Sequence, residues 1–182
     1  MQNRRSASRI FTAGVVLAWV SLAATASVHA QADTAPGPLG TAEGVVRRLY
    51  DLVTFETGQS PDWGQVRSLF LEQAVIVLRT SRSATTVFSV DGFVNDFVTF
   101  IERANVQETG FTERVLRTKP TVFGDMAHVW VLYEASIPGS PRPPQQGVDS
   151  FSLIKQDGRW WIAAVTNEIP TPMRPVPPPL QE

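Results

Sequence analysis

The spacing of apolar residues changes part-way along this chain, and that change limits the folds the chain can adopt. Between Thr41 and Gly58 the apolar residues recur three and four positions apart, which predicts a helix capped by Thr41 and stopped by Gly58. From Thr109 onward, β-branched and aromatic residues form successive runs separated by turn residues, which is typical of strands. Helices followed by consecutive antiparallel strands predict an α+β domain.

Two more helices and an early strand are predicted before Thr109. Ser60 can cap a short second helix, with Pro61 at its first position. Residues 74–78 are entirely apolar and mostly β-branched, which predicts a buried strand. A polar stretch over residues 80–86 then leads to a third helix that Ser89 can cap.

The second half of the domain reads as four strands joined by short turns or a loop. Phe123-Gly124-Asp125 and Gln156-Asp157-Gly158 supply turn residues, and Asp-Gly between two strand-like runs predicts a tight hairpin. A loop rich in proline and glycine separates the middle two strands. The predicted strands span residues 109–118, 126–137, 147–155 and 159–167.

The first thirty residues predict a cleavable export signal, so we expect a secreted or periplasmic protein. A basic start precedes an apolar run over residues 10–24, and the small residues before Gln31 predict cleavage between Ala30 and Gln31. The run is shorter than the roughly 20 residues of a membrane-spanning helix. Cleavage is therefore favoured over a stable membrane anchor, and Arg4-Arg5 leaves a twin-arginine route open beside the general one.

The segments flanking the predicted domain have a different composition from it. Residues 31–40 are small, polar and rich in proline and glycine, which predicts a flexible linker. Residues 170–182 contain too many prolines to continue a sheet and predict a disordered tail. The domain itself is therefore expected over residues 41–169.

Charge and composition exclude several classes of function. The chain has 16 Lys and Arg against 17 Asp and Glu, and removing residues 1–30 takes away three arginines, which leaves 13 against 17 and a net charge of −4. This mildly acidic chain lacks the basic clusters of a nucleic-acid-binding protein. It has no cysteine, and His128 is the one histidine after the predicted cleavage. We therefore expect no thiolate chemistry, no multi-histidine metal site and no cofactor.

Several short strings together resemble secreted SnoaL-like members of the nuclear-transport-factor-2-like superfamily, over about residues 41–169. The strings are Asp62-Trp63, Arg67-Ser68-Leu69-Phe70, Gly110-Phe111-Thr112-Glu113, Ala127-His128-Val129, Tyr133-Glu134, Gly147-Val148-Asp149-Ser150 and Gly158-Arg159-Trp160-Trp161-Ile162. The resemblance implies a curved antiparallel sheet wrapped around about three N-terminal helices, a cystatin-like cone with a pocket. It also implies a possible homodimer through the outer face of the sheet.

The same resemblance directs attention to carboxylates and a tyrosine on the strands. Members similar to ketosteroid isomerases use buried carboxylates and a tyrosine hydroxyl in an apolar cavity. Glu113, Asp149 and Tyr133 are the corresponding catalytic candidates here. Strand alternation places Tyr133 with the apolar residues of its strand, and it places Glu113 on the same face as Arg117. The alternative interpretation is a solvent-facing Glu113 and a Tyr133 that only packs in the core.

Further strand residues are candidates for lining the pocket. Arg117, Ser150, Trp161 and Asn167 are the ones singled out. His128 lies on the opposite face from Tyr133. Dehydratase-like members use a His/Asp pairing, which a mature chain with one histidine barely supplies, so that mechanism is disfavoured, and the Asp-Arg-Asp set of the epoxide-hydrolase-like members is not matched. A polyketide-cyclase-like reaction with a single carboxylate is the least demanding enzymatic hypothesis.

The sequence is compatible with three functions. The short supply of convergent acid and base groups favours an exported, non-catalytic domain that binds a small apolar molecule or serves as an accessory domain. The second hypothesis is a SnoaL-like lyase or isomerase in which Glu113 or Asp149 is the general acid or base. The third is a homodimeric interaction module whose cavity is filled by side chains. Fold alone does not decide among them, because this fold hosts many functions.

Overall fold

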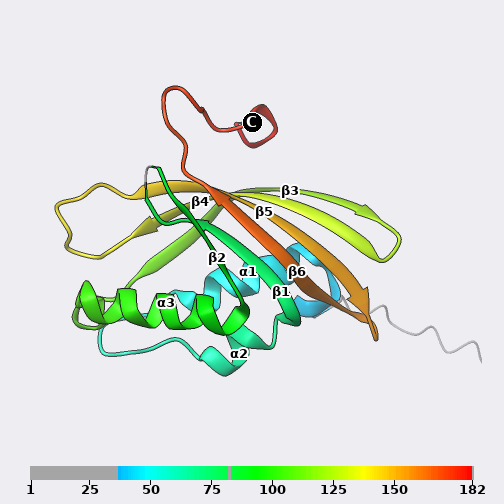
Figure 1. Ribbon diagram of the computed structural model, residues 1–182, viewed down its shortest axis with the longest axis horizontal. Coiled ribbons are helices and arrows are strands. Elements are labelled where there is room, and N and C mark those ends of the chain that lie inside the picture. Colours follow the sequence, from blue (N-terminus) through cyan, green and yellow to red (C-terminus); the bar gives the residue numbers. More distant parts are fainter. Residues whose placement is uncertain (1–36, 82, 182) are drawn as a thin grey trace, which may run out of the picture. The chain divides into compact units, whose positions relative to one another are not determined.

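The computed structural model describes residues 37–81 and 83–181, and the predicted export signal and its cleavage site lie outside these residues. Within these residues, three α-helices precede or interrupt the strands (Figure 1). The helices are α1 (Ala42–Val53), α2 (Trp63–Arg67) and α3 (Val90–Arg103). The strands are β1 (Phe70–Arg79), β2 (Thr85–Phe88), β3 (Thr112–Phe123), β4 (Met126–Ser136), β5 (Gln145–Gln156) and β6 (Arg159–Glu168). Short 3-10 turns occur at η1 (Pro38–Gly40), η2 (Val106–Glu108) and η3 (Pro178–Leu180).

Side-chain caps begin α1, α2 and α3. The hydroxyl of Thr41 accepts a hydrogen bond from the Gly44 amide at 3.0 Å, and that of Ser89 accepts one from the Gly92 amide at 3.1 Å, which confirms both predicted caps. The second helix starts later than predicted. Asp62, rather than Ser60, caps it by accepting from the Gln65 amide at 3.0 Å, so Pro61 precedes the helix.

The six strands form one sheet in the order β2-β1-β6-β5-β4-β3. Neighbouring strands are antiparallel except β1 and β6, which run parallel, so the expectation of an entirely antiparallel sheet is corrected. The long connection from β1 through α3 to the later strands makes a parallel pairing possible. The predicted polar stretch over residues 80–86 contains the start of β2, a mostly exposed edge strand.

Strand β3 runs five residues beyond the predicted end at Thr118. It passes through Pro120, which argues against a central strand but is tolerated here because β3 lies at the edge of the sheet. At its other end β3 begins at Thr112, and Phe111 forms a separate bridge with Phe55 after α1. Because Phe55 is paired in this bridge, α1 ends at Val53, before Gly58, where the sequence predicts its end.

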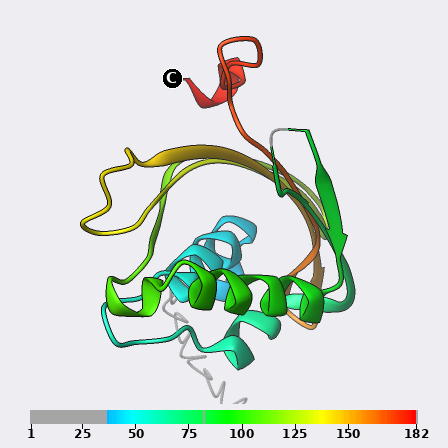
Figure 2. The same cartoon turned by 60° about the vertical axis from the view of Figure 1, so that its left-hand side comes forward.

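The sheet curves around α1, and α3 crosses the open side of the curve (Figure 2). The principal core lies between the concave face and the helices. Its fully buried members include Val45 and Val46 from α1, Ile76 from β1, Phe151 from β5 and Ile162 from β6. The α+β fold class is thus as predicted. None of the helices within residues 37–81 and 83–181 has the length and hydropathy needed to span a membrane.

The segment after β6 differs from the disordered tail that the proline content predicts. It passes to the convex side of the sheet (Figure 1), and its 3-10 turn η3 packs against β3 and β4. Leu180 in this turn is completely buried, with 0% exposure. The described part of this proline-rich segment therefore packs against the sheet without strand-pairing hydrogen bonds to its strands, because burial of the Leu180 side chain anchors the segment.

Leu180→Ala should therefore lower the free energy of unfolding by about 2 kcal/mol or more, because it removes a buried leucine side chain. Met173 lies in the same segment but is 91% exposed, so Met173→Ala is the matched control and should leave stability unchanged. Urea unfolding followed by tryptophan fluorescence measures both variants. Equal stability of Leu180→Ala and the parent protein would show that the segment is not anchored there.

Candidate functional site

A cavity of about 300 Å³ lies between the concave face of the sheet and the helices. Phenylalanine side chains make up much of its wall, and they come from the sheet, from α3 and from the segment before β3. They are Phe70, Phe93, Phe97, Phe100, Phe111 and Phe151. The wall is therefore suited to a mainly apolar molecule.

The phenylalanines on the α3 side of the cavity pack against one another. The ring centroid of Phe97 lies 5.8 Å from that of Phe100 and 5.5 Å from that of Phe111, both with edge-to-face geometry. Phe100 and Phe111 are 5.4 Å apart. Such edge-to-face pairs are favourable and fix ring orientation, so this wall is shaped before any ligand enters.

Polar side chains converge on the opposite, sheet side of the cavity around Asp149. The Tyr50 hydroxyl from α1 donates to Oδ2 of Asp149 at 2.5 Å, and the Asn167 amide from β6 donates to Oδ1 at 2.7 Å. The same amide nitrogen donates to the Tyr133 hydroxyl on β4 at 3.1 Å. Four elements therefore supply one connected network, in which both oxygens of the buried Asp149 have a donor.

One O–H in this network, that of Tyr133, has no acceptor among the described residues. The two amide hydrogens of Asn167 are used by Asp149 and Tyr133, and its oxygen accepts from the Arg79 backbone amide at 3.4 Å. Tyr133 thus accepts one hydrogen bond, and within the described residues no group accepts its own O–H. Since Tyr133 lines the cavity, this O–H is available to a ligand.

Glu113 is the second carboxyl group of the cavity. It sits at the start of β3, where the Thr54 hydroxyl accepts from the Glu113 amide at 2.9 Å and donates to the Glu113 carbonyl at 3.0 Å. These two bonds satisfy backbone groups that an edge strand would otherwise leave open. They also fix the point from which the Glu113 side chain enters the cavity. Within residues 37–81 and 83–181, no hydrogen-bond donor reaches its carboxyl group.

The cavity raises the pKa values of both carboxyl groups. Burial, and then the nearby charge of Asp149, raise the pKa of Glu113 to about 8. Burial also raises the pKa of Asp149 to about 6, although the hydrogen bonds from Tyr50 and Asn167 oppose the rise. At neutral pH, Glu113 is therefore mostly a neutral acid and Asp149 mostly a carboxylate. Burial and then the Asp149 charge also raise the pKa values of the Tyr50 and Tyr133 hydroxyls well above the ordinary value.

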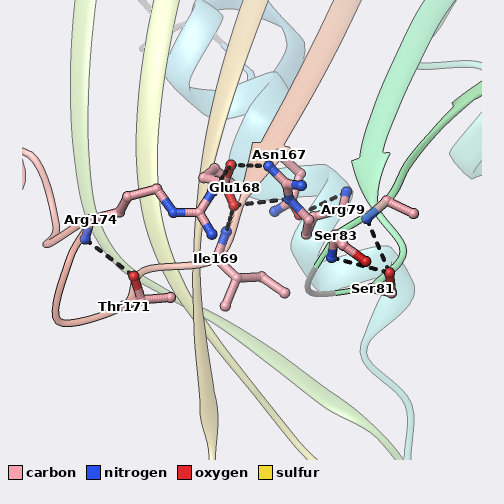
Figure 3. A network of polar contacts seen from close by, with 9 residues as sticks. Arg79, Ser81, Ser83, Asn167, Glu168, Ile169, Thr171 and Arg174 are labelled. Carbon is pink, nitrogen blue, oxygen red and sulfur yellow. Dashed lines mark hydrogen bonds and ion pairs between the residues drawn. The ribbon is translucent and has the colours of Figure 1, made fainter.

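Ionic contacts hold the chain at one side of the cavity, where Arg79 and Ile169 contribute to the wall. Glu168 at the end of β6 pairs with the guanidinium of Arg79 on β1 and with that of Arg174 at 2.8 Å (Figure 3). Glu168 also accepts from the Ile169 amide at 2.9 Å. These contacts, with that of Arg79 first, lower the pKa of Glu168. They fix the start of the C-terminal segment beside the cavity.

Four of the residues singled out in the sequence meet in the cavity. Glu113, Tyr133, Asp149 and Asn167 all line it. Tyr133 does so because it shares the inner face of β4 with the buried Ala127, Val129 and Val131, as the strand alternation predicts. The sequence indicated no direct link between these candidates, whereas the structure joins three of them through the Asn167 amide.

Three other candidates do not line the cavity, which corrects the predictions made for them. The β3–β4 register shifts between Val115 and Arg117, so a bulge turns Arg117 to the face opposite Glu113, where it is exposed. Ser150 faces outward and lies 2.7 Å from Nε2 of His128. Trp161 is also absent from the wall, and the Arg159 guanidinium stacks 3.7 Å above the centre of its ring.

Tyr50 is the site residue that the sequence reasoning missed. Its position within the apolar stripe of α1 made it a core residue, and it is indeed only 3% exposed. A signal was present, because Tyr50 is the one hydroxyl-bearing member of that otherwise aliphatic stripe and a buried tyrosine hydroxyl needs a partner. The sequence could not show that the partner would be Asp149, 99 residues further along the chain.

The described residues contain no group of three or more Asp, Glu, His or Cys side chains arranged to hold a metal ion. The donors present are instead suited to hydrogen bonding and proton transfer. A carboxylate, a neutral carboxylic acid and two phenols face one apolar space, and these groups can bind an acceptor oxygen or move a proton.

A close approach of backbone and ring sets the position of Tyr133. A methyl group placed on Gly147 of β5 would lie 2.3 Å from Cζ and 2.4 Å from the hydroxyl oxygen of Tyr133, its neighbour across the strand pair. Only glycine leaves room for the tyrosine ring to lie over β5 in this way. Gly147 is thus a positioning residue for the Tyr133 hydroxyl.

Comparison with known proteins identifies the fold. No protein-family model and no curated protein match the sequence. An NTF2-like protein with a cystatin-like fold from Novosphingobium aromaticivorans has a TM-score of 0.55 and 15% identity, covering 69% of this chain and 77% of that protein. An NTF2-like protein of unknown function from Pseudomonas putida KT2440 has a TM-score of 0.56 and 10% identity, covering 77% and 92%.

A third solved structure agrees with these two. A protein of unknown function with a cystatin-like fold from Nostoc punctiforme has a TM-score of 0.55 and 10% identity, covering 73% of this chain and 90% of that protein. The chain therefore has the NTF2-like, cystatin-like fold, and the predicted architecture is confirmed at that level. At these identities the likeness concerns the fold alone.

Gly147→Ala should lower the free energy of unfolding by about 1–3 kcal/mol, because the added methyl group forces the Tyr133 ring to move. A double-mutant cycle with Tyr133→Ala identifies the cause. In the Tyr133→Ala background, Gly147→Ala should cost much less, because the ring that it strikes is gone. The same cost in both backgrounds, measured by urea unfolding, would refute the positioning role of Gly147.

Proposed function

We propose that this domain is an exported binding protein for a small, mainly apolar molecule that carries a hydrogen-bond-accepting oxygen. The observation that supports it best is the cavity of about 300 Å³, in which a phenylalanine wall faces two O–H donors that have no acceptor among the described residues. Most of a ligand's contact area would be aromatic and aliphatic. The few polar groups would fix its orientation.

The two donors are the Tyr133 hydroxyl and the carboxyl group of Glu113. The Tyr133 O–H has no acceptor in the described part of the chain, and the raised pKa of Glu113, about 8, keeps its carboxyl group protonated at neutral pH. Both groups can donate to a carbonyl or ether oxygen. A buried donor without a partner is costly, so a ligand that supplies an acceptor gains affinity over one that does not.

The charge of Asp149 limits the chemistry of the ligand. Its pKa of about 6 leaves it mostly ionised at neutral pH, and its two oxygens are already bonded to Tyr50 and Asn167. An anionic group placed in the same apolar space would be repelled. The part of the ligand inside this cavity is therefore uncharged.

A SnoaL-like lyase or isomerase is the second candidate, and the pKa values favour it. A carboxylate of pKa about 6 beside a carboxylic acid of pKa about 8 is a pair able to accept and donate protons near neutral pH. In that role Asp149 would remove a proton next to a carbonyl group, and Glu113 with Tyr133 would hold the carbonyl oxygen. Perturbed pKa values in a cavity favour such sites without assigning a reaction.

Binding can be tested with 2-acetylnaphthalene and 2-ethylnaphthalene, which have similar size and differ in the acceptor oxygen. The ketone should bind more tightly, and Tyr133→Phe should weaken ketone binding about 3- to 10-fold without affecting the hydrocarbon. Raising the pH from about 7 to about 9 should weaken ketone binding as Glu113 loses its proton, and Glu113→Gln should abolish this pH dependence. Equal affinity for both compounds would contradict the proposal, and so would the absence of any binding.

The same samples distinguish binding from catalysis. Deuterium exchange into the acetyl group of the ketone, followed by proton NMR, reports proton removal next to a carbonyl. The enzymatic candidate requires exchange faster than in buffer and its loss in Asp149→Asn. Tight binding with exchange at the buffer rate would support the binding function alone.

A further inference from the structure

A second cavity of about 300 Å³ adjoins the first. It lies beneath the loop between β4 and β5, and three residues line both cavities: Phe100 on α3, Phe111 before β3, and Gln145 at the start of β5. The rings of Phe100 and Phe111 and the side-chain amide of Gln145 thus form the boundary between two cavities of similar volume. A ligand longer than the first cavity can extend past this boundary into the second.

The two cavities differ in charge. The first is lined by three carboxyl groups, those of Asp96, Glu113 and Asp149, and by Arg79, whereas Arg142 is the one ionisable residue of the described chain that lines the second. The Arg142 backbone amide donates to the Ser140 hydroxyl at 3.2 Å, which shapes the loop. Within residues 37–81 and 83–181, the Arg142 guanidinium has neither an ion pair nor a hydrogen bond. Arg79, the arginine of the first cavity, is by contrast paired with Glu168.

This contrast determines where an anionic group could lie. Asp149 repels an anion in the first cavity, and the Arg142 guanidinium attracts one in the second. An elongated molecule with an uncharged body and an anionic end would satisfy both cavities in only one orientation. Its body would lie among the phenylalanines, and its charged end would lie under the loop.

We propose that the second cavity is a subsite for the anionic end of an elongated carboxylate ligand, and that Arg142 binds this end. The inference rests on the proposed binding function and adds to it the class of ligand, an uncharged apolar body that bears an acceptor oxygen and ends in a carboxylate. Arg142 acts as a specificity residue, because it distinguishes this class from neutral molecules of the same shape. The side chains of Ser140 and Gln145 also line this cavity, and they can hydrogen-bond the ligand carboxylate oxygen that Arg142 does not bind.

The test compares 3-(2-naphthoyl)propionate, a naphthyl ketone with a carboxylate end, with its neutral methyl ester, by isothermal titration calorimetry. Arg142→Gln should weaken binding of the acid about 3- to 10-fold and leave the ester unchanged. Raising the salt concentration from about 50 mM to about 500 mM should weaken binding of the acid to the parent protein and have little effect in Arg142→Gln.

Lys119→Gln is the matched control, since it removes one positive charge from β3 at a residue that lines neither cavity. It should leave the affinity for the acid unchanged. If acid and ester both bind and Arg142→Gln affects them equally, the subsite is refuted while the proposed binding function stands. An equal loss of acid affinity in Lys119→Gln would also refute it, by showing a general effect of charge. If the acid, the ester and 2-acetylnaphthalene all fail to bind, the proposed function itself is refuted.

Discussion

The buried carboxylate of Asp149 ties the first helix of the domain to the inner face of its sheet. Tyr50 reaches it from α1 and Asn167 from β6, and the Asn167 amide extends the contact to Tyr133 on β4. A buried carboxylate without such donors would be strongly destabilising, so these side chains have to stay in place. Thr54 positions Glu113 through its hydrogen bonds to the Glu113 backbone, and the missing side chain at Gly147 leaves room for the Tyr133 ring. Glu113 and Tyr133 complete the site. The cavity is therefore the space between this polar network and the phenylalanine wall.

The two carboxyl groups make the stability of the domain depend on pH in a defined direction. Their pKa values, about 6 for Asp149 and about 8 for Glu113, lie above the ordinary values of 3.8 and 4.5. The folded state thus binds more protons than the unfolded state between each ordinary value and its raised one. Each group contributes stability that is fully present below its ordinary pKa and is lost as the pH rises through the raised value. These two groups thus contribute less stability at neutral pH than at acidic pH, and the same burial gives the domain a carboxylic acid that still holds its proton at neutral pH.

Local signals in the sequence were sufficient for much of the fold. The caps at Thr41 and Ser89, the Asp157-Gly158 hairpin and the inward face of β4 all depend on neighbouring residues, and the structure agrees with them.

The arrangement of the site residues depends more on contacts between residues that are far apart in the sequence. An unforeseen bulge at Leu116 reversed the facing of Arg117, and the partner of Tyr50 lies on a strand far along the chain. Neither a single extra residue in a strand nor a pairing across the fold leaves a periodic pattern. The proline content of the C-terminal segment does not predict its packing for a similar reason, because the burial of Leu180 depends on a surface formed by β3 and β4.

The proposed function depends most on a carboxylic acid that remains protonated at neutral pH inside the cavity. Carbon-13 NMR of the side-chain carboxyl of Glu113, assigned by its loss in Glu113→Gln, measures this directly across a pH titration. The structure predicts that this carboxyl titrates at about pH 8, well above its ordinary value of 4.5. A midpoint near 4.5 would mean a charged, solvated Glu113 and would contradict the site described for this domain.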